Sequence, residues 1–460
     1  MHFTRSIRLA IVLVMASGAA VLAQDTGAPR GFLFGAGGGD VNSRNSLGIF
    51  VDMSVSSVSD SGLAGALPIG DADFLVHGLT SQLTTSADYA RARRRTLLMV
   101  NGSTSFIYFS SLDRVSPVSH AANLRWAARL PRRSTLRLSS SAAYTPAYLY
   151  ELFPTASASD ADELIAANPD YRILRTPSYS YGAKAALRLG SDKNLHVMTS
   201  VEKNRTEFDQ GFLMQPDLST SEARVQLIDP VSGRLSWSVD YGHGTATYGV
   251  AGKTNADRIS GAVEYSYALS RTHRLRFRLN VGPGILHVPA DSVFASLPSL
   301  APPPDQNRPE AGQTIRLYEL ESDATIDVDL GSRLRGSVNY RRGTEYLALL
   351  TQPVFADAVR ADMSGLITRR VEWSASGGYA TGTSALNQTA DGLRTTTAQF
   401  RTRYALSRSL AAYAEYLHYW YDLRDQSPLA PGLPHLFKRH EIRFGGMLIV
   451  RPIHTKGRTR

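Results

Sequence analysis

The strict alternation of apolar and polar residues between Arg271 and Tyr340 is the feature that most limits how this chain can fold. Over 275–281 and again over 318–330, apolar side chains occupy nearly every second position. Successive side chains of a β-strand point to opposite faces, so both segments are expected to be strands with one apolar face. The polar positions between them are basic in the first segment, acidic in the second and basic again at 335–341. The pattern predicts a sheet with a charged face and an apolar face, but it does not say what the apolar face touches.

The first 23 residues have the features of a Sec signal peptide. Arg5 and Arg8 precede an apolar run at 9–14, small residues follow, and Val21-Leu22-Ala23 fits the rule for cleavage. We therefore expect Sec export with cleavage near Ala23. The alternative, an N-terminal membrane anchor, would need a longer apolar stretch.

Composition excludes several classes of function. The chain has no cysteine, which excludes disulfides, thiolate metal sites, cysteine nucleophiles and a lipoprotein anchor. Without residues 1–23 it carries 48 Lys and Arg against 40 Asp and Glu, spread over strands and turns. Nucleic-acid binding needs a concentrated basic stripe, so no nucleic-acid partner is expected. Beyond residue 23 no run reaches the roughly 20 apolar residues of a membrane helix, which leaves a secreted or an outer-membrane β-protein.

After a Gly-rich segment at 24–44, short basic turns alternate with longer loops rich in Pro, Ser and Asp. Eight short turns and nine long loops join 18 expected strands. An even count, with both chain ends on the short-turn side, is the topology of a bacterial outer-membrane barrel. A count of 16 also fits if the first strand or the Gly-rich segments do not span. The short turns are expected at 91–95, 131–134, 190–194, 231–234, 270–273, 331–333, 368–370 and 407–409.

The four tryptophans indicate which medium the apolar face meets. All four lie in the apolar register of their strands, three beside short turns and one beside a long loop. Aromatic rings at both ends of an apolar band are typical of membrane interfaces. Small residues at mid-strand apolar positions, such as Ala183, Gly261 and Gly377, fit lipid better than the close-packed core of a soluble sandwich, which is the alternative. The expected lipid-interface aromatics are Trp126, Trp237, Trp373, Trp420, Tyr144 and Tyr148.

With these features the sequence resembles the bacterial outer-membrane β-barrel proteins of porin-like size, over nearly the whole mature chain. The resemblance lies in the signal peptide, the alternating strands, the aromatic girdles, the basic short turns and the final amphipathic strand at 442–450. It implies an all-β, transmembrane, antiparallel up-and-down barrel with short periplasmic turns and long extracellular loops, and it identifies no subfamily. Many such barrels end on an aromatic residue that the insertion machinery reads, whereas this chain ends in a basic tail. The expected organisation is a signal peptide at 1–23, a flexible periplasmic lead-in at 24–44, the transmembrane barrel at 45–452 and the basic tail at 453–460.

If the apolar face meets lipid, the charged face lines a lumen. Opposite charges on neighbouring strands can then pair, each pair giving roughly 0.2–1 kcal/mol. Barrels of about 16 to 18 strands are too wide for side chains to fill. We therefore expect an outer-membrane channel that passes small hydrophilic solutes or an exported polymer. The expected lumen-lining charges are Arg276, Arg278, Glu319, Glu321, Asp323, Asp327, Asp329, Arg335, Arg401, Arg403 and Arg443.

A second reading is a structural or secretion-associated barrel that binds envelope polysaccharide or a partner without free conduction. The expected partners in either case are outer-membrane lipid, lipopolysaccharide and the barrel-insertion machinery. No cofactor, metal site or enzyme activity is expected, because the histidines are scattered and no Gly-x-Ser-x-Gly element occurs. Within the loop at 151–178, residues 159–167 predict a capped short helix, which lies outside the barrel or folds inward as a constriction.

Overall fold

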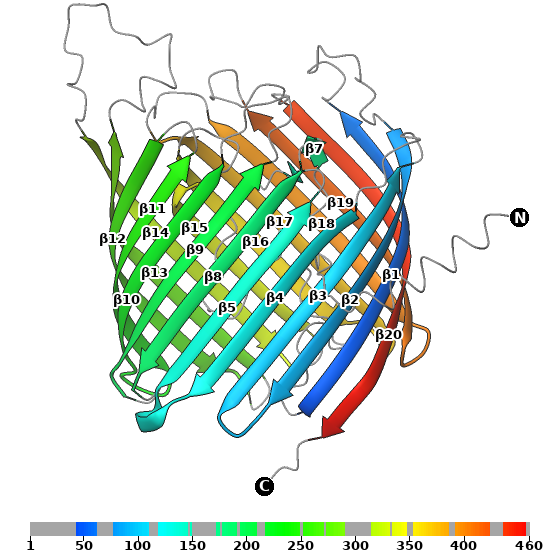
Figure 1. The fold of residues 1–460 in the computed structure, drawn as a ribbon, viewed down its shortest axis with the longest axis horizontal. Coiled ribbons are helices and arrows are strands. Elements are labelled where there is room, and N and C mark those ends of the chain that lie inside the picture. Colours follow the sequence, from blue (N-terminus) through cyan, green and yellow to red (C-terminus); the bar gives the residue numbers. More distant parts are fainter. Residues whose placement is uncertain are drawn as a thin grey trace, which may run out of the picture.

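The computed structural model is a closed antiparallel β-barrel with strongly tilted strands (Figure 1). Eighteen strands form one sheet, and β1 (Ser43–Ser61) pairs with β20 (Leu436–Lys456) to close it. The expected all-β up-and-down barrel of 18 strands is confirmed. The structure describes residues 43–61, 77–109, 118–145, 148–149, 172–174, 177–190, 194–208, 217–248, 252–270, 273–289, 314–331, 334–346, 353–385, 392–423 and 436–456.

Each remaining strand of the wall pairs with its neighbours in sequence. Two short strands, β6 (Tyr148–Leu149) and β7 (Arg172–Leu174), form a separate sheet that is not part of the wall. The other wall strands are β2 (His77–Ala92), β3 (Thr96–Phe109), β4 (Val118–Arg129), β5 (Thr135–Thr145), β8 (Ser178–Leu189), β9 (His196–Phe208), β10 (Leu218–Asp229), β11 (Leu235–Tyr248), β12 (Gly252–Ala268), β13 (His273–Pro289), β14 (Thr314–Leu330), β15 (Leu334–Glu345), β16 (Val354–Leu366), β17 (Val371–Ser384), β18 (Leu393–Ala405) and β19 (Leu410–Leu423).

The wall runs from Ser43 to Lys456, a few residues beyond the expected 45–452 at each end. The signal peptide, most of the lead-in and the helix expected at 159–167 lie outside the described residues. Within the described part of the chain, no helix is long and apolar enough to cross a membrane.

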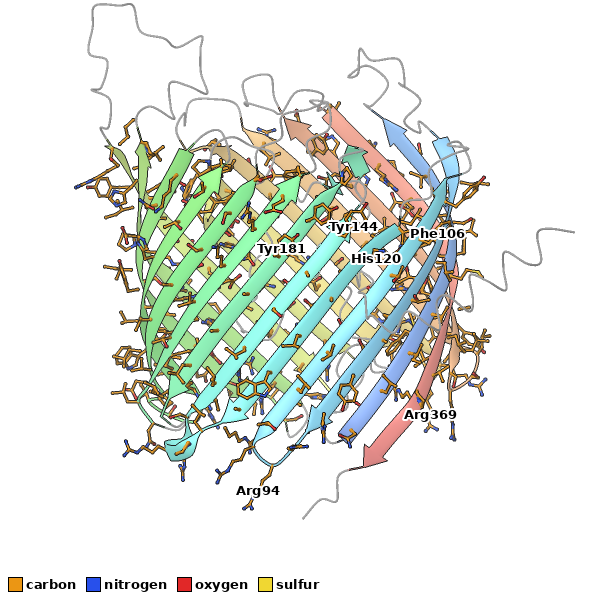
Figure 2. The ribbon with its side chains drawn as sticks, viewed as in Figure 1. Arg94, Phe106, His120, Tyr144, Tyr181 and Arg369 are labelled. Atoms are coloured by element: carbon orange, nitrogen blue, oxygen red, sulfur yellow. The ribbon has the colours of Figure 1, made fainter. Side chains whose placement is uncertain are left out.

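Four of the short turns share one hydrogen-bonding pattern, which explains why they resemble one another in sequence. In each, a Ser or Thr hydroxyl oxygen accepts a hydrogen bond from the backbone N–H three residues later, and short hydroxyl side chains stabilise tight turns in this way. The short turns lie at one end of the barrel, where Figure 2 labels Arg94 and Arg369. The pairs are Ser232 with Leu235 at 3.0 Å, Ser270 with His273 at 3.1 Å, Thr368 with Val371 at 3.1 Å and Ser407 with Leu410 at 3.0 Å.

Contacts between distant strands show which face of the wall is inside. The ring of Tyr248, at the end of β11, lies 6.4 Å from the ring of Tyr346, which follows β15. Three strands separate β11 from β15 in the wall, so these rings meet across the interior. Tyr248 therefore faces inward, and because faces alternate along a strand, the pairing register assigns the other residues of the wall. The apolar rows, including Val239, Val263 and Leu279, face outward and are exposed.

β12 and β13 approach each other unusually closely at Gly282. The ladder between them pairs Arg258 with Gly284 and Gly261 with Val281, and skips the residues between. A Cβ atom built on Gly282 would lie 1.9 Å from the carbonyl oxygen of Ile259 and 2.5 Å from the Cα atom of Ser260. A side chain here would have to push the two backbones apart.

We expect Gly282→Ala to lower the free energy of unfolding by about 1–3 kcal/mol, because overpacking against backbone cannot be relieved by a rotamer change. The measurement is urea unfolding of the protein refolded into lipid vesicles. Gly261→Ala is the matched control, since a Cβ there meets nothing within 4 Å. Equal stability of the two variants would contradict the close approach.

Candidate functional site: a charged lumen with a narrowed mouth

The register places the charges expected in the lumen on the inner face. They come from five strands, and neighbours on adjacent strands stand opposite one another, for example Arg276 with Asp327 and Asp329 with Arg335. Burial then divides nine of them into two groups with different surroundings, and the other two, Glu319 and Glu321, lie toward the long-loop end of β14. The inward residues are Arg276 and Arg278 on β13, Glu319, Glu321, Asp323, Asp327 and Asp329 on β14, Arg335 on β15, Arg401 and Arg403 on β18, and Arg443 on β20.

The expected interface aromatics divide differently. Trp126, Trp237, Trp373, Trp420 and Tyr144 lie on outward positions of their strands. Tyr148 belongs to β6, which is not part of the wall.

An aromatic band follows the long-loop end of the wall on the outside. Figure 2 shows Phe106, His120, Tyr144 and Tyr181 at similar heights on neighbouring strands. The rings of His120 and Tyr144 stack at 6.1 Å between centroids, and Tyr144 and Tyr179 lie 5.2 Å apart. Rings with polar edges at this level mark the boundary between lipid tails and headgroups.

One part of the inner wall keeps its charges in contact with water. We call the inward charges of β12–β15 at the short-turn half the open ladder, which consists of Glu264, Arg276, Arg278, Asp323, Asp327, Asp329 and Arg335. Its ion pairs are long: Arg276 Nε lies 3.6 Å from Glu264 Oε1, and Arg335 Nε lies 3.7 Å from Asp329 Oδ1. The Arg335 side chain is 55% exposed. Pairs of this kind hold their charges loosely and leave them available to ions.

The other part of the inner wall is largely shut off from water, since all of its charged residues except Asp52 are buried. We call the inward charges of β17–β20 and β1 the buried ladder, which consists of Asp52, Glu372, Arg401, Arg403, Glu415, Arg439, Glu441 and Arg443. Glu441 is 2% exposed, and its carboxylate accepts hydrogen bonds from Arg439 at 3.0 Å and Arg443 at 2.8 Å. Acids and bases are equal in number in this group. The buried ladder is therefore a neutral brace of the wall and not a surface for passing solutes.

Aromatic contacts tie the buried ladder to the seam where the barrel closes. The Tyr413 hydroxyl donates to Asp52 of β1 at 2.7 Å, and the Arg401 guanidinium lies 4.1 Å above the Tyr413 ring. Arg401 also reaches Asp52 at 3.7 Å. These contacts join β18 and β19 to β1 across β20, so they reinforce closure from the inside.

Apolar side chains narrow the lumen at the long-loop end. We call this group the mouth cluster, which consists of Phe208, Leu218, Ala246, Tyr248, Leu286, Val288, Tyr346 and Ala385. Tyr346 packs against both of its halves, one from β9–β11 and the other from β13 and the end of β17. Side chains from strands four positions apart in the wall thus meet at the mouth.

The backbone of β15 accounts for this narrowing. The β14–β15 ladder ends at the pair Ser322–Arg342, whereas β15 stays paired to β16 up to Glu345–Val354. The end of the β15–β16 hairpin therefore leaves the wall line of β14 and carries Tyr346 over the lumen. Two carboxylates lie near the place where this hairpin leaves the wall, and both contact Arg258. Its distance is 2.8 Å to Glu222 and 3.4 Å to Glu321.

The mouth cluster was not expected from the sequence. The alternation rule assigned apolar residues to the lipid side, yet Leu286, Val288 and Leu317 lie on the inward parity of their strands. The available signal was the loss of alternation at 285–288, where apolar residues occupy both parities. Among the described residues, no three His, Cys, Asp or Glu side chains are grouped so that they could hold a metal ion.

We expect Glu441→Gln to lower the free energy of unfolding by about 2–4 kcal/mol, because two buried arginines lose their shared carboxylate charge. Asp329→Asn, on the open ladder, is the matched control and should cost about 0–1 kcal/mol, as exposed pairs do. Denaturant unfolding of both variants in the same vesicles gives the comparison. Similar costs would show that the buried ladder does not brace the wall.

The sequence matches no protein family model and no curated protein. Solved structures with a similar fold include OpdQ of Pseudomonas aeruginosa, with 9% identity, 89% of this chain and 99% of that chain covered and a TM-score of 0.44. OccAB2 of Acinetobacter baumannii has 8% identity, coverage of 89% and 98% and a TM-score of 0.43. The ferric-catecholate import receptor Fiu of E. coli K12 has 9% identity, coverage of 87% and 81% and a TM-score of 0.41. Similarity at this level assigns neither a subfamily nor a substrate.

The wall itself carries the assignment. Its strands pair all the way round, its outer face is apolar between two polar ends, and its inner face is charged. Lipid excludes unpaired backbone groups, and a closed barrel with this distribution is the β-structure that satisfies them. The chain is therefore an up-and-down transmembrane β-barrel protein.

Proposed function

We propose that this barrel is a passive channel for small hydrophilic solutes. The observation that carries the proposal is the open ladder, a stripe of water-accessible charges on the inner face of β12–β15. A barrel of 18 strands leaves an aqueous interior when side chains alone line it. Charges that line such an interior bias which ions and solutes pass.

The difference between the two ladders gives the channel an off-centre path. Water reaches the open ladder, whereas the buried ladder on the far part of the wall does not meet water. Solutes therefore travel along β12–β15. The path is lined by both signs of charge, which suits polar solutes of small size.

The mouth cluster favours small solutes over an exported polysaccharide. It brings side chains from strands four positions apart in the wall into contact, which covers part of the mouth and leaves less width for a polymer. Glu222 and Glu321 beside this cluster give the entrance an acidic character around Arg258. Size is thus selected at the mouth and charge along the ladder.

Planar-bilayer recording of the refolded full chain tests the proposal. We expect a stable conductance, and Arg276→Gln with Arg278→Gln should raise the cation-to-anion permeability ratio by about twofold or more. The reason is that each unit charge at about 4 Å changes the energy of an ion by roughly 1 kcal/mol even in water.

The matched control is Lys203→Gln with Arg205→Gln on β9. These residues have the same spacing and lose the same charge, but they face outward. The control should keep the wild-type permeability ratio. An inserted barrel that carries no current would overturn the channel proposal and favour a barrel that binds envelope polymer or a partner.

Tyr346→Ala tests the role of the mouth separately. Removal of the ring that joins both halves of the mouth cluster should increase the single-channel conductance and admit larger neutral polymers in a solute-exclusion assay. Phe444→Ala on the outer face of β20 is the control, since it deletes an aromatic ring without touching the lumen. An unchanged conductance in Tyr346→Ala would mean that the mouth does not limit flow.

A further inference from the structure

A group of basic side chains lies on the outer face of β12–β14 at the long-loop end. We call it the basic outer patch, and it consists of Lys253, His287 and Arg316. His287 stands directly opposite Arg316, and it also pairs with Asn255, two residues from Lys253 on the same face. Directly opposed residues have Cβ atoms about 4.5–5.5 Å apart and diagonal ones about 7–8 Å. Three bases on three adjacent strands can therefore reach one ligand group.

Two of these bases have no partner in the described part of the chain. Neither Lys253 nor Arg316 forms an ion pair or hydrogen bond there. Two other outward bases of the wall are paired: Arg342 on β15 lies 3.6 Å from Asp357, and Arg205 on β9 lies 2.7 Å from Glu207. The patch thus has positive charge that the wall does not neutralise.

The nearest acid is already occupied. Asp257 lies 3.3 Å from His287 through Oδ2, and its Oδ1 atom lies 2.8 Å from both His243 Nδ1 and the Tyr241 hydroxyl. It holds the imidazole of His287 in place beside Arg316. Asp257 contacts neither Lys253 nor Arg316, and its single negative charge offsets only one of their two positive charges, so the patch keeps a net positive charge.

The outer face directly below the patch is strongly apolar. Tyr318 and Leu320 are the next two outward residues of β14 and are 70% and 58% exposed. Ile285 stands opposite Tyr318, and Ile259 on β12 is also exposed. This surface continues the lipid-facing rows of the same strands. The outer face therefore changes from apolar to basic between Tyr318 and Arg316, two consecutive outward residues of β14.

We propose that the basic outer patch binds a phosphate of lipopolysaccharide in the outer leaflet, with the lipid's acyl chains against Tyr318, Leu320 and Ile259. A ligand for this surface must carry an anion directly above an apolar body, and a phosphorylated glycolipid has this form. A free phosphate ion would use the bases but would leave the apolar rows without a partner. The proposal rests on the outer-membrane location and does not depend on conduction.

Binding of fluorescent lipopolysaccharide to the full-length protein in nonionic detergent tests the proposal. We expect Lys253→Gln with Arg316→Gln to weaken binding at least tenfold, since each basic residue near a lipid phosphate is worth about 1 kcal/mol or roughly fivefold. The wild-type protein should lose a similar factor with lipopolysaccharide whose phosphates have been removed. Lys253→Arg with Arg316→Lys keeps the charges and should bind within a few-fold of the wild type.

The control is Arg132→Gln with Arg133→Gln, which removes the same charge at the short turn on the opposite side of the membrane. It should bind like the wild type, and circular dichroism of every variant verifies the fold. Wild-type binding by the Lys253/Arg316 variant, or equal binding of dephosphorylated lipopolysaccharide, would overturn the proposal. Inorganic phosphate that binds the patch as tightly as the lipid would overturn it as well, in favour of a free-anion site.

Discussion

Closure of the sheet between β1 and β20 is the constraint on which the rest of this structure depends. Inside a bilayer no water satisfies backbone N–H and C=O groups, so each strand needs a neighbour on both sides. Pairing runs along the seam from Ser43–Lys456 to Ser61–Lys438, interrupted by two local register shifts. Closure then fixes inside and outside, because the side chains of every strand must alternate between the lumen and lipid. The outward apolar rows and the inward charges follow from this single condition.

Burial decides what an inward charge does in this barrel. Glu441 and Asp329 are both acids on the inner wall beside arginines, but Glu441 is shut off from water and Asp329 is half exposed. A buried, matched group loses much of its hydration and gains rigidity from fixed partners. An exposed group keeps its field in the water path and exchanges partners easily. The barrel therefore uses acidic side chains both to brace its seam and to line the water-filled part of its lumen.

The mouth shows where a local rule stops applying. Period-two alternation gives the correct face for Phe277 and Ile326, whose partners are their neighbours in the sheet. It fails for Leu286 and Val288, because these inward side chains are covered by Tyr346 and Ala385 from strands elsewhere in the wall. Such contacts depend on the bend of the β15–β16 hairpin, and no residue spacing records that bend. The basic outer patch was missed for a similar reason, since its bases come from three strands that the register brings together.

The sequence by itself determined the barrel and the apolar and charged rows, because alternation and the similar Ser/Thr turns are local properties of each hairpin, and the structure decided for 18 strands over 16. The inward placement of Arg276, Asp327 and Arg335 follows from the same parity once the barrel is closed. Only the tertiary structure decided which charges water reaches, how the mouth narrows, and which outward bases stand together. Those properties arise from the pairing register of the strands and from contacts between residues distant in sequence, and the physical cause is that burial and electrostatic partners depend on all the neighbours in space.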